Sequence, residues 1–368
     1  MTRFNLRKTF IAVASVAAYV LSIPAYASDS DRLVILHTND THSIIDPYYR
    51  DNLGGVLRRK ALIDSVRSVE PNVLLVDAGD VLQGSLYFTL FEGKVEQMVM
   101  NGLGYDVQIL GNHEFDNGME KLANYLKGLN ADLIATNYDL SHTDIDRYFK
   151  PYTIKEVDGK RIGFLAININ PEGLIDSAKC TGVEYLDAVK AANAMAWYLR
   201  HVEHCDYVIA VSHIGYDEKG KISDAMLARN TEGIDVIIGG HSHTLVNPDA
   251  ANPLPSRFVN LAGDTVLVAQ TGRYGANLGE ITLDLNSGKA DSKIITVTDR
   301  LDSNADPELA KLIGPYKHKV DSVYAIKVGT AETPFECRPE LMNWMADFVL
   351  DDSRRLTKKK IDMAIVNV

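Results

Sequence analysis

Side chains that bind divalent metal ions follow five separate apolar runs of this sequence. Each run is strand-like, and the motifs that come just after are Asp40-Thr41-His42, Gly79-Asp80, Gly111-Asn112-His113-Glu114, Ser212-His213 and Gly239-Gly240-His241-Ser242-His243. Five of the chain's ten histidines lie in these motifs. Because open α/β sheets place their ligand sites where strands end, we expect the motifs to meet at one edge of the sheet.

Seven of these side chains are candidate metal ligands. They offer imidazole nitrogens, carboxylates and one amide oxygen, but no thiolate: Asp40, His42, Asp80, Asn112, His213, His241 and His243. Such a mixed set suits Zn, Mn, Co or Fe. One four-coordinate ion needs only four of these groups, whereas two ions that share a carboxylate use all seven. The sequence therefore predicts two divalent metal ions, an arrangement that clamps the attacking and leaving oxygens in phosphatases and nucleases.

The order of the motifs resembles that of the calcineurin-like metallophosphoesterases. The longer strings Leu36–His42, Leu110–Asp116 and Ile238–His243 look more narrowly like the bacterial secreted 5'-nucleotidases, a group that includes UDP-sugar hydrolases and 2',3'-cyclic phosphodiesterases. The resemblance implies a two-sheet α/β/β/α metallophosphoesterase sandwich. It also implies an enzyme that hydrolyses nucleotide-type phosphate esters in nucleotide catabolism.

The resemblance distributes the ligands between two ions. It implies a first ion bound by Asp40, His42, Asp80 and His243, and a second ion bound by Asp80, Asn112, His213 and His241. Asp80 would then bridge the two. Some family members carry Gln at the position of His243, where His is also a competent ligand.

A catalytic dyad of His113 and Asp116 is implied by the same resemblance. The imidazolium of His113 would face the substrate and stabilise the leaving group, and the carboxylate of Asp116 would orient the ring. A positioned acid of this kind accelerates a reaction by about 10²–10⁴-fold. Asp116 has a second interpretation as the N-cap of a helix from Asn117 onward.

Other polar residues receive structural interpretations. We expect Asp77 to support the site or cap a loop rather than bind metal, and His37 to be buried and hydrogen-bonded within the first strand. Of the three cysteines, Cys180 and Cys205 are candidates for a disulfide, but the sequence cannot place them close together.

Strand–helix alternation must position these motifs. Apolar runs near Leu33, Val73, Val107 and Leu133 are separated by helical stretches, as in a layered α/β domain. A hairpin is predicted around Asp158-Gly159. The hairpin strands and the later strands are predicted at Tyr152–Val157, Arg161–Ile167, Tyr207–Ser212, Val236–Gly239, Thr265–Gln270 and Leu278–Leu285.

The first 27 residues have the pattern of a signal peptide. Basic residues precede the apolar stretch Phe10–Leu21, and Ala25-Tyr26-Ala27 fits a cleavage site after Ala27. The apolar stretch is shorter than the roughly 20 residues that a membrane span needs. We therefore expect a periplasmic or secreted protein with no membrane span after cleavage. The net charge of −11 and the lack of a basic tract argue against nucleic-acid binding.

The sequence pattern and the family resemblance together imply four segments: a signal peptide (1–27), a calcineurin-like metallophosphoesterase domain (28–300), a connector helix (301–324) and the start of an incomplete 5'-nucleotidase C-terminal domain (325–368). An apolar strand is predicted at Ile361–Val368, where the family continues with groups that contact the substrate phosphate and stack on the base.

Several functions are compatible with this organisation. The leading one is hydrolysis of small phosphate esters, above all nucleotides. In the first alternative, the chain is a less selective phosphoesterase that works without the nucleoside pocket, or whose missing domain is supplied by a separate chain. In the second, it is a non-catalytic metal- or nucleotide-binding protein, and hydrolysis of sulfur esters is a related possibility within the fold.

Overall fold

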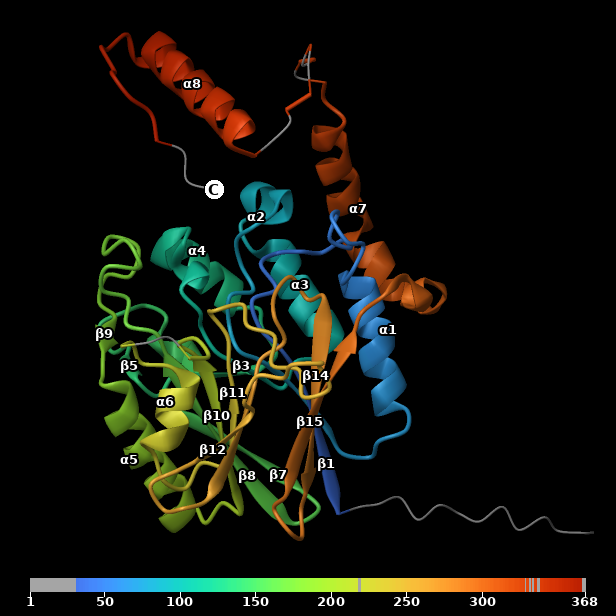
Figure 1. Cartoon of the computed structure of the whole chain (residues 1–368), viewed down its shortest axis with the longest axis vertical. Coiled ribbons are helices and arrows are strands. Elements are labelled where there is room, and N and C mark those ends of the chain that lie inside the picture. Colours follow the sequence, from blue (N-terminus) through green and yellow to red (C-terminus); the bar gives the residue numbers. More distant parts are fainter. Residues whose placement is uncertain are drawn as a thin grey trace, which may run out of the picture. The chain divides into compact units, whose positions relative to one another are not determined.

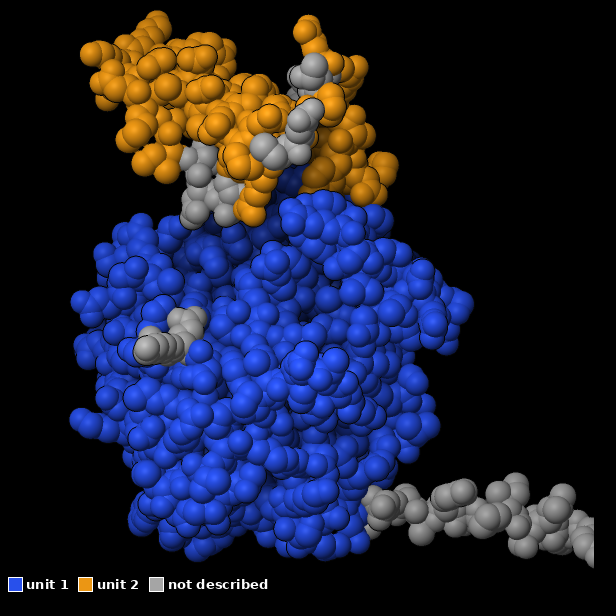
Figure 2. Space-filling view, viewed as in Figure 1, with its two compact units in different colours: residues 1–317 blue, residues 318–368 orange. Residues whose placement is uncertain are grey.

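The computed structural model describes residues 31–217, 220–327, 329–330, 332, 334–335 and 338–365. The predicted signal peptide, residues 1–27, lies outside the described residues. The chain divides into two compact units, residues 1–317 and 318–368 (Figure 2). Among the described residues, no helix has both the length and the apolar character needed to cross a membrane.

A mostly parallel sheet of seven strands contains the first three motif-bearing strands. In spatial order, the strands are β15 (Ala290–Thr296), β14 (Asn277–Asp284), β1 (Arg32–Thr38), β2 (Val73–Asp77), β3 (Val107–Gln108), β4 (Asp132–Ile134) and β6 (Phe149–Lys150). From β1 to β6 neighbouring strands are parallel, whereas β14 pairs antiparallel with both β1 and β15.

The remaining motif-bearing strands lie in a second sheet of six strands. Its spatial order is β12 (Arg257–Val259), β13 (Thr265–Ala269), β11 (Val236–Ile238), β10 (Tyr207–His213), β8 (Lys160–Asn168) and β7 (Tyr152–Val157). The four central strands are parallel, and the outer strands β12 and β7 are antiparallel to their neighbours. The predicted hairpin is confirmed as β7–β8, and β5 (Tyr138–Asp139) pairs with β9 (Glu184–Tyr185) in a small separate ribbon.

The helices of the described residues are α1 (Val56–Arg67), α2 (Leu86–Phe91), α3 (Lys94–Leu103), α4 (Gly118–Leu126), α5 (Ala188–His201), α6 (Asp224–Arg229), α7 (Pro307–Tyr324) and α8 (Arg338–Thr357). Within the first compact unit, helices connect the parallel strands and cover the outer faces of the sheets. Three short 3₁₀ helices are His113–Phe115, Asp146–Tyr148 and Asp299–Asn304. Figure 1 shows α5 and α6 on the side of the molecule opposite to α1.

Two apolar layers explain why the sheets stack. Side chains of alternating residues, such as Leu33 and Ile35 of β1 and Phe164 of β8, pack between the two sheets. The other face of the second sheet packs on α5 and α6, for example through Leu165 and Ala192. This arrangement confirms the predicted α/β/β/α sandwich, in which parallel strands covered on both faces are continuous apolar runs.

The second compact unit differs from one expectation. It contains α8, but residues 361–365 are irregular rather than a strand, and residues 366–368 lie outside the described part. A strand needs a neighbour to satisfy its backbone groups. Among the described residues of 318–368 there is no other strand to provide one, so the predicted strand at Ile361–Val368 is wrong for its described residues.

Candidate active site

The sheet topology brings the five motifs together. Strands β1 and β2 are parallel and in register at Thr38 and Asp77, so the loops that carry Asp40 and Asp80 leave the same edge. In the second sheet, β10 and β11 are also parallel, and they end at His213 and just before the His241–His243 loop. The carboxyl ends of neighbouring parallel strands meet at one edge of a sheet, which explains why residues far apart in sequence converge.

The ligand loops have an unusual backbone conformation. Five of the seven predicted ligands have left-handed φ angles: Asp40 (51°), His42 (49°), Asp80 (56°), His241 (77°) and His243 (55°). This conformation is uncommon for residues other than glycine. Such residues concentrate at functional sites, where the surrounding structure fixes them. The backbone strain therefore points to this edge independently of the side-chain types.

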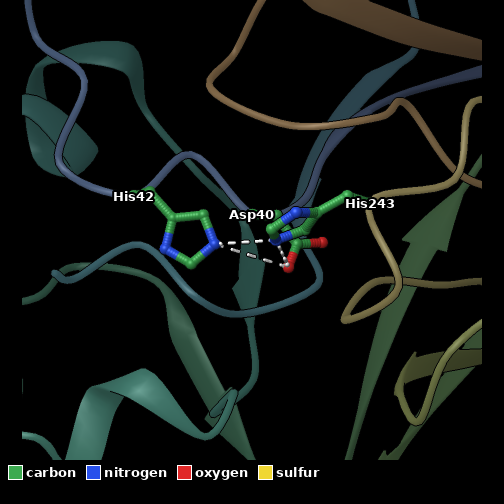
Figure 3. A group of neighbouring side chains, drawn as sticks. All are labelled: Asp40, His42 and His243. Atoms are coloured by element: carbon green, nitrogen blue, oxygen red, sulfur yellow. Dashed lines mark hydrogen bonds and ion pairs between the residues drawn. The ribbon is translucent and has the colours of Figure 1, made fainter. Parts of the chain in front are cut away.

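Three of the predicted ligands form a first group. Nε2 of His42 lies 2.9 Å from Nε2 of His243, and Oδ1 of Asp40 lies 3.3 Å from the latter and 3.8 Å from the former (Figure 3). Figure 3 shows the two rings and the carboxylate pointing toward one another. The ligand atoms of all three residues lie within 4.8 Å of one another, which is a spacing that one ion can bridge.

Three more form a second group with the same spacing, namely Asp80, His213 and His241. Oδ2 of Asp80 lies 3.1 Å from Nε2 of His213. Oδ1 of Asn112 lies 2.8 Å from Nδ1 of His241, so the seventh predicted ligand joins this group. All seven predicted ligands are thus in or beside one of two groups.

Asp80 lies between the two groups. Its Oδ2 atom is 4.0 Å from Nε2 of His42 in the first group, besides its contact with His213 in the second. The side chain is fully buried, which by itself raises the pKa of its carboxyl; the neighbouring His213, His42 and His113 outweigh burial and set the pKa below its usual range. Asp80 is therefore a buried carboxylate in position to bridge two cations.

The tautomer of His213 fits a metal ligand. Nδ1 donates a hydrogen bond to the carbonyl oxygen of Ala78 at 2.6 Å, which leaves the lone pair of neutral His213 on Nε2. That Nε2 atom is buried and lies 3.1 Å from the carboxylate of Asp80, which is itself an acceptor and has no proton to donate to the lone pair. Burial lowers the pKa of His213, but the charges of Asp80 and Asp40 raise it to about 10. The same negative field that attracts a proton to Nε2 attracts a divalent cation, so the residues present fit a metal ion.

The predicted dyad is in place beside these groups. Nδ1 of His113 lies 2.8 Å from Oδ2 of Asp116, and the backbone N–H of His113 donates to Oδ1 of Asp80 at 2.8 Å. Burial lowers the pKa of His113, but Asp116 and Asp80 more than offset it, so that the pKa lies above its usual value. The N-cap of α4 is Asn117, so the alternative in which Asp116 caps this helix is wrong.

Glu114 is a supporting residue to which the sequence assigned no role. Its carboxylate is buried and accepts the backbone N–H groups of Asp80 (2.9 Å), Val81 (2.7 Å), Leu82 (3.2 Å) and Gly111. One side chain thus joins the loops that carry the Asp80 and Asn112 ligands. Burial raises the pKa of Glu114 to about 7. The only sequence signal is its place beside two functional residues in the Gly111–Glu114 motif.

Asn39 connects the first ligand group to a later loop. Its side-chain amide donates to Oδ2 of Asp40 at 2.6 Å and to the carbonyl oxygen of Gly272 at 2.8 Å. Its oxygen accepts from the backbone N–H of Thr271 at 2.9 Å. The sequence placed Asn39 within a motif but did not assign it this role.

The prediction for Asp77 is confirmed, whereas the prediction for His37 is confirmed only in part. Asp77 accepts hydrogen bonds from Thr38 (2.6 Å) and from the N–H of Gly79 (2.9 Å), which confirms its supporting role. His37 is fully buried as expected, but neither ring nitrogen has a hydrogen-bond partner among the described residues, so this part of the prediction is wrong. The ring packs against Gly279 on β14, where the facing strand offers no side chain that could bond to it.

The candidate disulfide between Cys180 and Cys205 is not formed. Cys180 and Cys205 are both free thiols, and Cys205 is buried. Cys337 lies outside the described residues.

Comparison with known proteins places the site in a family. The model of the family described as calcineurin-like phosphoesterase matches residues 33–245. The chain is 28% identical to the trifunctional nucleotide phosphoesterase protein YfkN of Bacillus subtilis, over 91% of this chain and 24% of that protein. It is 30% identical to the 5'-nucleotidase of Bos taurus, over 81% of this chain and 54% of that protein. The chain therefore spans about half, or less, of the length of these relatives.

A solved structure of a 5'-nucleotidase precursor is also similar to this chain. The 5'-nucleotidase precursor from Thermus thermophilus superposes with a TM-score of 0.76 and 30% identity, over 88% of this chain and 68% of that one.

Proposed function

Because this chain belongs to the calcineurin-like phosphoesterase family, we propose that its site hydrolyses small phosphate esters with two divalent metal ions and that nucleotides are its substrates. The observation that carries the proposal is the position of Asp80, buried between two ligand groups and next to the backbone of His113. Metal ligands alone would fit a storage or structural site. A carboxylate-oriented histidine beside them is what catalysis of ester cleavage requires in addition.

We propose that Asp40, His42, Asp80 and His243 bind the first ion and that Asp80, Asn112, His213 and His241 bind the second. When bound, two divalent ions supply Lewis-acid polarisation of the phosphoryl oxygens and a nucleophile at neutral pH. The mixture of imidazole, carboxylate and amide ligands suits Zn, Mn, Co or Fe.

The dyad has a defined part in this reaction. Oδ2 of Asp116 accepts a hydrogen bond from Nδ1–H of His113, which orients the ring and favours its protonated form. The imidazolium then donates its Nε2 proton to the oxygen of the leaving group as the ester bond breaks. The hydrogen bond from the backbone of His113 to Asp80 fixes the dyad relative to the ligands. Precise placement of this kind is necessary, since misplacement by about 1 Å reduces rates by about 10²-fold.

The proposed substrate class rests on the relatives. The two relatives described above are called a nucleotide phosphoesterase and a 5'-nucleotidase. For this chain, we propose 5'-nucleotides, UDP-sugars or 2',3'-cyclic nucleotides as the esters that it cleaves. Export to the periplasm or the cell exterior is part of the proposal and rests on the signal-peptide pattern of residues 1–27.

The experiment is a metal-dependent substrate panel. The purified chain is stripped with a chelator, reloaded with Mn²⁺ or Co²⁺, and incubated with AMP, UDP-glucose, 2',3'-cyclic AMP, an aryl phosphate and an aryl sulfate. We expect hydrolysis of at least one nucleotide, lost on chelation and restored by the metal. Binding of two ions without hydrolysis of any ester would favour the non-catalytic alternative. Cleavage of sulfur esters alone would favour the related sulfur-ester activity.

A further inference from the structure

Aromatic rings and guanidinium groups gather beside the first ligand group. They come from two loops that lie far apart in the sequence, and they form what we call the Tyr–Arg cluster: Tyr48, Tyr49, Arg50, Arg273 and Tyr274. All of these residues belong to the compact unit of residues 1–317. The dyad and the metal ligands do not account for them.

Tyr274 and Arg273 join the cluster to the metal ligands. The ring of Tyr274 lies 5.9 Å from that of His42 and 6.3 Å from that of His243, measured between centroids. Its backbone N–H donates to the carbonyl oxygen of Asp40 at 2.7 Å. Nη1 of Arg273 lies 3.3 Å from Nδ1 of His243. The cluster is therefore the next layer of side chains outward from the first ligand group.

Contacts between tilted rings, and between rings and guanidinium groups, extend the cluster away from the ligands. The guanidinium of Arg273 lies over the ring of Tyr274 at 4.6 Å, and the ring of Tyr48 lies 4.7 Å from that of Tyr274. Tyr49 follows at 4.9 Å from Tyr48, with the guanidinium of Arg50 at 5.4 Å from its ring. The rings thus form a continuous row that begins at the metal ligands.

Two glycines allow the loops to approach this closely. A Cβ atom at Gly54 would lie 2.9 Å from the carbonyl oxygen of Gly275, and Gly54 has a φ of 74°. A Cβ atom at Gly275 would lie 2.7 Å from Nη1 of Arg59. The close approach of Gly54 to Gly275 thus brings the loop that follows Tyr48 against the loop that carries Tyr274.

The outer members of the row are accessible. Tyr49 is 78% exposed, Arg50 and Arg273 are exposed, and Tyr48 and Tyr274 are partly exposed. A row of exposed aromatic rings is unfavourable in free energy, because it leaves a large apolar area in contact with water. Aromatic and guanidinium planes have one chemistry in common, which is stacking on a planar group.

From these contacts, we propose that the Tyr–Arg cluster is the subsite for the leaving group of the ester and that it takes a nucleobase. The rings of Tyr48 and Tyr49 stack on the base, while Arg273 attracts the anionic phosphate next to the first ligand group. A sugar separates phosphate from base in a nucleotide, so the base must be received some distance outward from the ligands, as Tyr48 and Tyr49 are. The inference rests on the proposed function and deepens it by assigning base recognition to this chain's own residues.

Binding and kinetics of two ligands test the proposal. AMP and ribose 5-phosphate share the phosphate and the ribose and differ in the base. Dissociation constants are measured by calorimetry, and kcat and KM by phosphate release, on the metal-loaded full chain. Base stacking of about 1–3 kcal/mol corresponds to about 5- to 150-fold in affinity. We expect the wild type to prefer AMP by about fivefold or more, and Tyr48→Leu and Tyr49→Leu to reduce that preference by raising KM for AMP.

Arg273 and a remote aromatic residue complete the design. Arg273→Ala should weaken AMP and ribose 5-phosphate alike, because both carry the phosphate, and Arg273→Lys should restore part of the loss. Trp197→Leu is the matched control, since Trp197 is also an exposed aromatic residue (59%) but lies on α5. It should leave both ligands unaffected. Metal content of every variant verifies that the ligand groups are intact.

The outcomes separate this inference from the proposed function. Hydrolysis with equal affinity for AMP and ribose 5-phosphate would overturn the subsite and leave the phosphoesterase activity standing. A preference for AMP that survives in both tyrosine variants would also overturn it. Base-dependent binding that is lost in the tyrosine variants, without hydrolysis of any ester, would support the subsite and overturn the proposed activity.

Discussion

Oδ2 of Asp116 lies 2.8 Å from Nδ1 of His113, three residues earlier in the chain. The short 3₁₀ helix His113–Phe115 brings the two side chains to the same side, and the second interpretation of Asp116 as a helix cap is excluded by the cap at Asn117. The pair lies outside both groups of candidate metal ligands, so we expect that it can be altered without removing a ligand.

Replacement of His113 tests the dyad. We expect His113→Asn to lower kcat by about 10²–10⁴-fold, because the acid for the leaving group is lost. Metal content should be unchanged, as measured by elemental analysis of the purified protein. His201→Asn is a suitable control, since this exposed histidine stacks on Trp197 away from the site. A parallel fall in metal content would identify His113 as a ligand and contradict its assigned role.

Gly111 offers a test of how closely the ligand loops are packed. A Cβ atom at this position would lie 2.5 Å from the backbone nitrogen of Asp80, so Gly111→Ala must displace the Asp80 loop. We expect a loss of about 10²-fold in kcat/KM together with weaker metal binding, measured by titration with Mn²⁺. Gly314→Ala on α7 is the control, because a Cβ atom there meets nothing within 4 Å. Equal behaviour of the two variants would show that the loop is more tolerant than its packing indicates.

Because His37 is buried, we expect the free energy of unfolding of the protein to depend on pH. Burial lowers the pKa of this histidine from 6.5 to about 3 in the folded state. The unfolded state therefore binds a proton more readily than the folded state does. The stability that neutral His37 contributes is fully present above its pKa in the unfolded state and is lost as the pH falls below that value. Between about pH 7.5 and about pH 5, the free energy of unfolding should fall by about 2 kcal/mol more in the wild type than in His37→Leu.

Denaturant unfolding at the two pH values measures this difference. Other titrating groups affect both proteins alike and cancel in the comparison. The same pH dependence in the wild type and in His37→Leu would show that the ring gains a partner or access to solvent that the structure does not contain.

The N-terminal pattern has a direct chemical test. Mass spectrometry of the protein exported from cells should find a mature N-terminus at Ser28, because the cleavage motif ends at Ala27. A start at Met1 in cells with a working export machinery would refute the signal peptide.

Much of the fold could be predicted because its strands are apolar runs bounded by turn residues. The run before Asp40, the hairpin at Asp158-Gly159 and the run before His213 all became strands within a residue or two of their expected limits. Parallel pairing then makes their polar ends converge, so the meeting of the candidate ligands at one edge followed from the strand pattern, whereas their division between two ions came from the family resemblance.

Features that depend on three-dimensional neighbours could not be predicted in this way. Glu114 accepts N–H groups from residues more than thirty positions earlier, and nothing in its local sequence indicates this. The missing hydrogen bond of His37 results from Gly279 on the facing strand. The contact between Tyr48 and Tyr274 likewise depends on two loops that meet only in the folded chain.

The metal content of the wild type and of Asp80→Asn tests the central claim most directly. Asp80 is buried between the two ligand groups, so an amide in its place removes the shared negative charge. After reloading with Mn²⁺, the wild type should bind two ions per chain, and Asp80→Asn should bind far fewer and hydrolyse no ester. Equal metal content in the two proteins would contradict a two-ion site bridged by Asp80.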